Sequence, residues 1–234
     1  MKKKFYFKLI KDFIRLGFNS DGITKIPNSI LKSIKHGTYL DIGCYHPFKD
    51  SHTALLYKNG WQGINLDISK ETVEMFKFLR PKDLNLNIGL SLKNGKQNAY
   101  FEKNISQVSS LDKSHIEKTG RKIVFTRSIN VLTLKKIRER YKIKKLDFLK
   151  IDCESLDSKI ILSSNLKTLN CNFLCVELLP QEVFGWKYKI PQKKNKNYFK
   201  KYFFKSKIYK KLSKHYVLVS NYHYAFLLKN KKII

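Results

Sequence analysis

Residues 38–43, which read TYLDIG, decide the fold class of this 234-residue chain. They form a short, mostly apolar run that ends in an acid and a glycine, a pattern typical of a buried strand with a turn beyond it. A second run of this kind, GINLD, occupies residues 63–67. A helical pattern at residues 51–58 separates the two runs, so the sequence predicts parallel strands joined by helices.

Strands and helices alternate along the rest of the chain. Further strands are predicted at residues 84–90, 146–152 and 173–178, and further helices at residues 27–35, 70–79, 134–141 and 157–162. Two further extended segments are predicted at residues 97–102 and 122–132, and a hairpin at residues 216–220 and 224–228. We therefore expect an α/β fold with a doubly wound, Rossmann-like, mostly parallel sheet, closed by a C-terminal β-hairpin. Residues 1–36 are expected to form an N-terminal helical extension and residues 37–234 the main domain.

The charge of the chain is extreme. Lys and Arg number 48 against 18 Asp and Glu, which gives a formal net charge of +30. Only six of the basic residues are Arg, the residue that suits bidentate phosphate binding. The excess of Lys therefore fits two explanations equally well, an A/T-rich coding sequence and an anionic partner. Hydrophobic residues make up 42% of the chain, which excludes a disordered polymer.

A basic, aromatic-rich insertion is expected at about residues 186–214. Within it, Lys193–Lys214 contains ten Lys, six aromatic residues and no acid. This pattern suits a surface that binds nucleic acid or lipid headgroups, and equally a helix whose aromatic side chains pack inward while Lys points outward. Residues 7–16 have the spacing of an amphipathic helix, which either packs on its own domain or lies in a membrane interface.

The four Cys, at positions 44, 153, 171 and 175, form no C-x-x-C pair. This usage favours a reduced protein and gives no indication of a metal site. The N-terminus lacks a signal-peptide cleavage pattern, and no apolar run is long enough to span a bilayer. We expect a cytoplasmic protein that at most binds the inner face of the membrane peripherally.

Two acids, Asp41 and Asp67, follow the first two predicted strands. In an open α/β sheet the ligand binds beyond the carboxyl ends of the strands, where Gly43 allows a close backbone approach. An acid at the end of the second strand suits the hydroxyls of a ribose. The dinucleotide fingerprint G-x-G-x-x-G is absent, because residues 45–47 read YHP. A nucleoside ligand smaller than a dinucleotide is therefore expected.

Five blocks of sequence, in order, resemble the FkbM family of S-adenosylmethionine-dependent methyltransferases, in particular its D-I-G-A-N-H-P branch. The blocks read DIGCYHP from residue 41, GWQGINLD from 60, RPKDLNLN from 80, SSL from 109 and LDFLKIDCE from 146. The resemblance covers about residues 39–179. The chain departs from the family at Cys44 and Tyr45, where Ala and Asn are usual, at residues 151–157 (IDCESLD for I-D-x-E-G-x-E), and at Lys135, where Asp is usual.

The resemblance implies a class I methyltransferase domain that binds S-adenosyl-L-methionine. Asp41 and Gly43, with Cys44 beside them, would line the methionine end of the cofactor. Asp67 would bind the ribose. The loop residues Ser109 and Ser110 would lie near the adenine or the substrate.

The acceptor side is expected at the end of the fourth strand, where Asp152 and Glu154 would face the transferred methyl group. Methyl transfer to a hydroxyl needs an in-line approach and a base for the proton. Asp152 is favoured as that base or as an orienting group, with Lys150 supporting it. Glu154 and His46 are further catalytic candidates. Glu154 could instead pair with a helix N-terminus, and His46 could instead pack its loop.

The favoured function is O-methylation of a sugar or glycan intermediate, with the basic insertion attracting an anionic acceptor at the membrane face. A second hypothesis is methylation of RNA ribose, in which Lys150, Asp152 and Glu177 mimic part of a catalytic set of two Lys, an Asp and a Glu. A third is a non-catalytic basic binding module that retains the fold.

Overall fold

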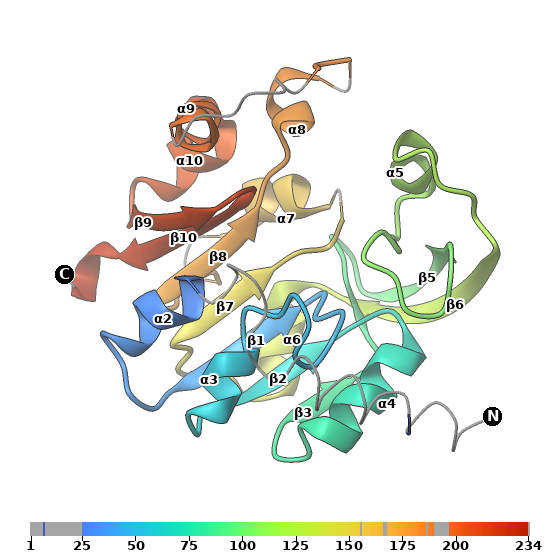
Figure 1. The fold of residues 1–234 in the computed structure, drawn as a ribbon, viewed down its shortest axis with the longest axis horizontal. Helices are drawn as coiled ribbons and strands as arrows, with labels where there is room; N and C mark the ends of the chain where they lie inside the picture. The colour runs from blue at the N-terminus through green and yellow to red at the C-terminus, as the bar shows by residue number, and fades with distance from the viewer. Residues whose placement is uncertain are drawn as a thin grey trace.

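The computed structural model describes Phe7 and residues 25–154, 156–165, 168–185, 187–189 and 197–233. A central sheet runs through the molecule with helices on both faces, and a smaller sheet lies at one side (Figure 1). The central sheet has seven strands in the order β3-β2-β1-β7-β8-β10-β9, and the smaller one has three in the order β4-β6-β5.

The elements have the following bounds. The strands are β1 Thr38–Ile42, β2 Gln62–Leu66, β3 Leu84–Leu86, β4 Gly89–Leu90, β5 Gly95–Phe101, β6 Phe125–Leu132, β7 Phe148–Ile151, β8 Phe173–Glu177, β9 Tyr216–Tyr222 and β10 Ala225–Asn230. The helices are α2 Lys25–Leu31, α3 Ala54–Lys58, α4 Lys70–Leu79, α5 Lys113–Lys118, α6 Leu134–Arg140, α7 Asp157–Ser163, α8 Pro180–Phe184, α9 Tyr198–Lys205 and α10 Lys207–Leu212, with a final 3₁₀ turn at Lys231–Ile233.

The pairing of the central sheet confirms the expected fold class. Strands β3, β2, β1, β7 and β8 pair in parallel, and the hairpin β9–β10 closes the sheet by antiparallel pairing of β10 with β8. The chain proceeds outward from β1 to β2 and β3, and then from β7 to β8 on the other side. The carboxyl ends of β1 and β7 therefore form a topological switch point, where ligands bind in doubly wound folds.

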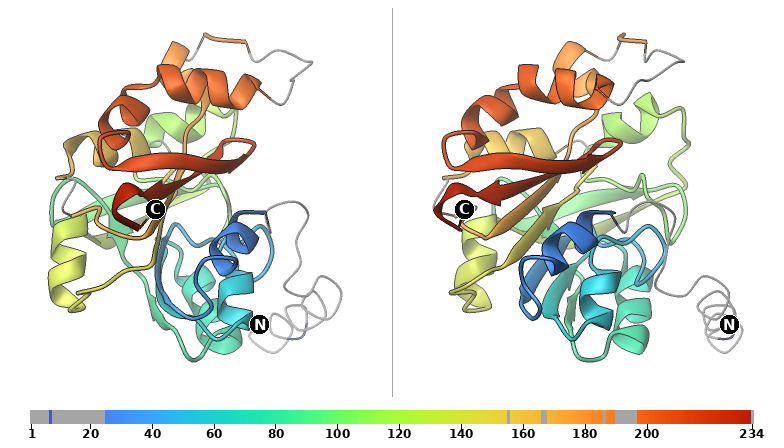
Figure 2. Two further views of the ribbon diagram at one scale, coloured as in Figure 1. Left: turned by 90° about the vertical axis from the view of Figure 1, so that its left-hand side faces the viewer. Right: turned by 60° about the vertical axis from the view of Figure 1, so that its left-hand side comes forward.

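Apolar side chains from alternate strand positions cover both faces of this sheet. On one face, Ile26 and Ile30 of α2 and Leu56 of α3 pack against Tyr39 and Phe148. On the other face, α6, α7, α9 and α10 pack in a larger cluster. Figure 2 shows α9 and α10 on one side of the hairpin and α2 and α3 on the other. Pro27 lies in the first turn of α2, where its missing N–H costs nothing.

The predicted strand at residues 84–90 is wrong as a single element. Residues 84–86 pair with β2 in the central sheet, whereas residues 89–90 pair with β6 in the smaller sheet. Between them, Asn87 donates from Nδ2 to the carbonyl oxygens of Asp67 and Ile68 at 2.9 Å each. This bond ties the chain to the end of β2 while it changes sheet. The extended segments predicted at residues 97–102 and 122–132 form β5 and β6, which pair antiparallel in the smaller sheet.

The helix expected from residue 51 begins at Ala54, because the preceding residues surround a buried arginine. Arg80 is fully buried and donates to Thr53 Oγ1 at 2.8 Å, to Ser51 Oγ at 2.9 Å and to the Pro47 carbonyl oxygen. Bonds of this kind compensate the desolvation of a buried guanidinium. Residues 51–53 therefore adopt a loop shaped around Arg80.

The described part of the basic insertion packs its aromatic side chains inward. Phe199, Tyr202 and Phe203 are buried, Phe203 stacks on Phe226 with ring centroids 4.0 Å apart, and Tyr202 donates from its hydroxyl to the Leu178 carbonyl. These rings belong to the core and are not seated in a headgroup layer. Phe204, 47% exposed, is the exception on α9.

Two expectations fall wholly or mostly outside the described residues. The amphipathic helix at residues 7–16 lies outside them apart from Phe7, and so do residues 190–196 of the basic insertion. Among the helices that the structure describes, none combines the length and apolarity that a bilayer crossing requires.

Candidate functional site

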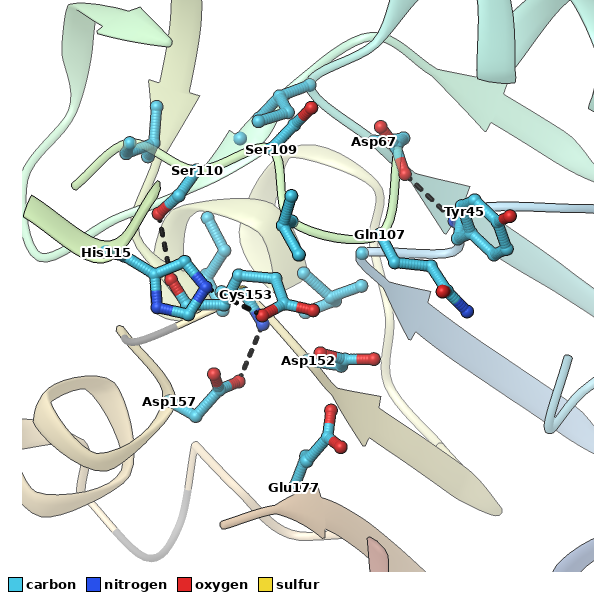
Figure 3. A pocket seen from close by; sticks show the side chains of 18 of the residues that line it. Tyr45, Asp67, Gln107, Ser109, Ser110, His115, Asp152, Cys153, Asp157 and Glu177 are labelled. Atoms are coloured by element: carbon cyan, nitrogen blue, oxygen red, sulfur yellow. Dashed lines mark hydrogen bonds and ion pairs between the residues drawn. The ribbon is translucent and has the colours of Figure 1, made fainter. Parts of the chain in front are cut away.

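A pocket of about 570 Å³ opens at the carboxyl edge of the central sheet. Its lining comes from the ends of β1, β2, β7 and β8 and from the loop at residues 106–111. Figure 3 shows Asp67 and Tyr45 at one end of this pocket and Asp152 and Glu177 at the other. The pocket therefore lies at the predicted switch point and brings the first and fourth predicted strands to one site.

A buried lysine organises the floor of the pocket. Lys150 of β7 lies in register with Asp41 of β1, so their side chains share one face of the sheet. Its Nζ lies 3.0 Å from Asp152 Oδ2 and 3.5 Å from Asp41 Oδ1, and donates to the Gly43 carbonyl oxygen at 2.7 Å. Burial alone would lower the pKa of Lys150, but Asp152 and Asp41 outweigh it and raise that pKa well above its usual value. Lys150 is therefore a fixed positive charge.

Gly43 permits the close contact between β1 and β7. Its φ is +71°, and a Cβ at this position would overlap the Asp152 carbonyl oxygen. Only glycine meets both conditions without strain. The close approach of the two strand ends therefore requires glycine at position 43, whether or not a ligand also approaches its backbone.

Asp67 directly follows β2 and lines that side of the pocket. Its Oδ2 accepts from the Tyr45 backbone N–H at 2.9 Å and its Oδ1 from that of Ser69 at 2.7 Å. Burial raises the pKa of Asp67 to about 6 despite these bonds. A carboxylate that lines a pocket and carries a desolvation cost gains from further hydrogen-bond donors, such as two ribose hydroxyls.

The two predicted serines lie in the pocket wall between these ends. Ser110 donates from Oγ to the Glu154 carbonyl oxygen at 2.8 Å and exchanges two backbone hydrogen bonds with Tyr100. Ser110 therefore joins the smaller sheet to the segment after β7. Ser109 lines the pocket, and its buried Oγ has no hydrogen-bond partner within the described part of the chain. Ser109 is the serine that is available to a ligand.

Three carboxylates converge at the other end of the pocket. One oxygen each from Asp152, Glu154 and Glu177 lies within 4.8 Å of the other two. Burial, followed by the nearby negative charge of Asp152, raises the pKa of Glu177 well above its usual value. Burial would also raise the pKa of Asp152, but the Lys150 ammonium lowers it overall. Asp152 is therefore the most acidic of the three carboxyl groups and is ionised at neutral pH.

Glu154 has a strained backbone and a histidine partner that the sequence did not indicate. Its φ is +48°, in the left-handed region that non-glycine residues rarely adopt. Its Oε2 lies 3.0 Å from Nε2 of His115, a buried residue of α5. Burial raises the pKa of Glu154. Asp157, not Glu154, is the acid in the first turn of α7, so the helix-terminus alternative for Glu154 does not fit.

Three predicted site residues lie outside the described pocket lining: Asp41, Cys44 and His46. Asp41 is buried beneath the pocket, where it accepts from Thr53 Oγ1 at 2.6 Å and faces Lys150. Cys44 is buried beside Asp67. His46 accepts at Nδ1 from the backbone N–H groups of Phe48 and Lys49. The expected direct roles of these residues therefore become supporting ones, and the loop-packing alternative fits His46.

Several lining residues were not anticipated from the sequence, among them His52, His115, Asp157 and Glu182. His52 follows the D-I-G-C-Y-H-P block within the loop around Arg80, and burial followed by the Lys150 charge lowers its pKa to about 4. His115 of α5 and Glu182 of α8 also line the pocket, and neither belongs to a recognisable sequence motif. Glu177 ends β8, so its place at the pocket could have been predicted, as for Asp41 and Asp67, from the rule that ligands bind at the carboxyl ends of parallel strands.

Comparison with known protein families identifies the family of this chain. The family described as the Methyltransferase FkbM domain matches residues 41–215. This range contains every residue of β1, β2, β7 and β8 that borders the pocket, together with the loop at residues 106–111. No curated protein matches the sequence.

Proposed function

Because the chain belongs to the FkbM methyltransferase family, whose domain covers most of its length, we propose that it transfers a methyl group from S-adenosyl-L-methionine to a hydroxyl of a sugar or glycan intermediate. One observation gives the proposal its main support. A ribose-type carboxylate, Asp67, and an ionised acceptor-side carboxylate, Asp152, border the same pocket at the switch point of the sheet.

The donor side of the pocket fits this cofactor. Asp67 offers carboxylate oxygens to ribose hydroxyls, and the buried, unpartnered Oγ of Ser109 offers a hydrogen bond nearby. The Gly43 backbone turns at the end of β1 without a side chain that would fill the pocket. When bound, the cofactor supplies an electrophilic methyl group.

The acceptor side supplies orientation and a place for the proton. Asp152, held by Lys150 at 3.0 Å, can accept a hydrogen bond from the attacking hydroxyl and direct its oxygen. As the new carbon–oxygen bond forms, the hydroxyl proton passes to this set of carboxylates. Burial raises the pKa values of Glu154 and Glu177, so the carboxylate of either is a stronger base than that of an exposed glutamate and can take up this proton.

The ribose assignment predicts a pH-dependent affinity. Only the carboxylate form of Asp67 accepts two hydroxyl bonds, and with a pKa of about 6 that form declines as the pH falls. S-adenosylmethionine should therefore bind about tenfold more weakly at pH 5 than at pH 7.5. Calorimetric titration should also show that Asp67→Ala costs ~1–3 kcal/mol of binding at pH 7.5.

Glu74→Gln is the matched control for this titration, since Glu74 lies on the exposed side of α4 and pairs with Lys77. Its affinity should match that of the wild type at both pH values. Asp67→Asn should bind weakly and without the pH dependence. An Asp67→Ala variant that folds and binds with undiminished affinity would reject the ribose role.

The RNA alternative gains less support from the pocket. Lys150, Asp152 and Glu177 do lie together, as that hypothesis required. However, Lys150 is the only Lys or Arg among the described residues of the lining, whereas the RNA-type catalytic set needs two lysines. The sugar or glycan hydroxyl is therefore the better-supported acceptor.

A membrane-bound acceptor remains part of the proposal, supported by exposed lysines on and beside α9 and α10. These are Lys200, Lys201, Lys205, Lys207, Lys210 and Lys214. The lysines should attract anionic vesicles with ~1 kcal/mol for each well-placed side chain, and salt should weaken the attraction. Since most aromatic rings of α9 are buried, the binding should be electrostatic, with little insertion.

Vesicle flotation at matched salt tests this surface. Combined Lys200→Gln, Lys201→Gln and Lys207→Gln changes should reduce binding to anionic vesicles at least tenfold, or ~1.4 kcal/mol. Lys77→Gln, on α4, should not. Retention on single-stranded RNA without vesicle binding would favour the RNA acceptor, and binding to neither would attribute the Lys excess to coding composition.

A further inference from the structure

The three convergent carboxylates have the arrangement of a ligand set. Asp152 and Glu154 follow β7, and Glu177 ends β8, so parallel neighbouring strands deliver all three to one point. Each of two members has one oxygen already held: Asp152 Oδ2 by Lys150 and Glu154 Oε2 by His115, both at 3.0 Å. Such outer partners orient the first ligands in metal sites and leave the second oxygen to the ion.

The unpaired oxygen of Asp152 is buried. Its Oδ1 accepts no hydrogen bond from a donor group in the described part of the structure. The Glu177 carboxyl is its close neighbour, so a proton or a cation is needed between these two acidic groups. This atom belongs to a residue of the pocket lining, so whatever satisfies it comes from within the pocket.

A second, independent observation comes from the loop after β1. His52 lines the same pocket and is only 8% exposed, and its Nδ1 also has no hydrogen-bond partner among the described residues. His52 immediately precedes Thr53, whose Oγ1 donates to Asp41 beside Lys150, so His52 lies near the pair formed by Lys150 and Asp152. An unsatisfied, buried ring nitrogen is costly unless a ligand or its bound water bonds to it.

The charge balance of the pocket favours a cation. Seven of the chain's 18 acidic residues line it: Asp50, Asp67, Asp152, Asp157, Glu154, Glu177 and Glu182. Against them stands one lysine, and Lys150 is already shared between Asp152 and Asp41. In a chain with a net charge of +30 this local excess of acid is unusual. Buried like charges repel strongly unless a counter-ion joins them.

We propose that Asp152, Glu154 and Glu177 bind a hard divalent cation, Mg²⁺ or Mn²⁺, with His52 beside it as a partner for the ion or its water. Carboxylate oxygens are the ligands that these ions prefer. Opposite ligands of such an ion lie about 4.2 Å apart, so oxygens within 4.8 Å of one another need only small side-chain rotations. No sequence motif indicates this site, because its members occur at the ends of two separate strands.

The role of the ion rests on the proposed function, although its binding does not. A cation held by these carboxylates leaves coordination positions for the acceptor hydroxyl, and it makes that hydroxyl more acidic. It would also let an acceptor with negative charge enter a pocket that is otherwise acidic. Asp152 would then direct the hydroxyl through the ion.

Manganese binding to the full chain tests the site without cofactor or acceptor. At pH 7.5 the electron paramagnetic resonance signal of free Mn²⁺ should decrease on addition of protein, with saturation at one ion per chain, and Mg²⁺ should compete. Glu177→Gln should weaken binding at least tenfold. Glu154→Gln, a second variant within the same set of three carboxylates, should do the same, and Glu139→Gln on the surface of α6 should leave it unchanged.

The outcomes separate this site from the methyltransferase assignment. Absence of saturable Mn²⁺ binding, or binding that both Gln variants leave intact, overturns the cation site whatever the enzyme does. Saturable binding that the two variants weaken supports it, even if calorimetry shows no S-adenosylmethionine binding, which would instead remove the proposed function. Thermal unfolding of each variant, measured without metal, identifies any loss of binding that is caused by misfolding.

Discussion

Asp152→Asn should slow methyl transfer by ~10²–10⁴-fold and leave the affinity for S-adenosylmethionine within about twofold of the wild type. The change keeps the shape of the side chain and removes the charge that orients the acceptor. Lys150 keeps Asp41 and the Gly43 carbonyl as partners, so the floor of the pocket should persist. Transfer of a labelled methyl group and calorimetric titration of the cofactor measure the two quantities separately.

Glu74→Gln serves as the control for this experiment too, because it removes a surface carboxylate of α4. Near-normal turnover in Asp152→Asn would make Asp152 a structural partner of Lys150 and would transfer the acceptor role to Glu154 or Glu177. Joint loss of turnover and cofactor affinity would show that Lys150 needs Asp152 to hold the pocket in shape.

Gly43→Ala should destabilise the protein by ~3 kcal/mol or more and abolish cofactor binding. The left-handed backbone costs a non-glycine residue ~1–2 kcal/mol, and forcing a methyl group into a packed contact costs a further ~1–3 kcal/mol. Here the methyl group would overlap the Asp152 carbonyl oxygen, so β1 and β7 must move apart at their carboxyl ends. Urea unfolding measures the first effect and calorimetry the second.

Gly120→Ala separates the two costs. Gly120 has nearly the same backbone angle, φ +72°, but a Cβ there would meet nothing within 4 Å. This control should lose only ~1 kcal/mol and keep its affinity for the cofactor. Equal destabilisation of the two variants would show that the strand ends can separate freely, contrary to the close contact in the structure.

The fold could be predicted well where local pattern and tertiary structure agree. The helix at residues 70–79 has the predicted bounds, because Ser69 caps it and Arg80 ends it. The hairpin was also correctly placed. The break at Asn87 was not predictable, since residues 84–90 (LNLNIGL) alternate apolar residues with Asn or Gly as one continuous strand would. Only the side-chain bonds to the end of β2 show where the chain changes sheet.

Some residues of the candidate site could likewise be predicted from the sequence, and others could not. Residues at strand ends, such as Asp67 and Asp152, were located because position in an alternating α/β pattern determines their place at the sheet edge. His115 could not be located, because a single histidine in a short helix gives no hint of a partner 39 positions along the chain at Glu154. Asp41 lies at the expected strand but is buried beneath the pocket, because burial cannot be read from sequence position alone; its contact with the cofactor stays a prediction.

The position of β10 between β8 and β9 determines when the sheet can be completed during synthesis. Leu174 and Val176 of β8 pair with Leu228 and Phe226, which are synthesised 54 and 50 residues later. Until then β8 has an unpaired edge of strongly apolar, β-prone sequence, the kind that other nascent chains can extend. This half of the sheet is therefore completed only after β10 has been synthesised, and until then aggregation at β8 competes with folding.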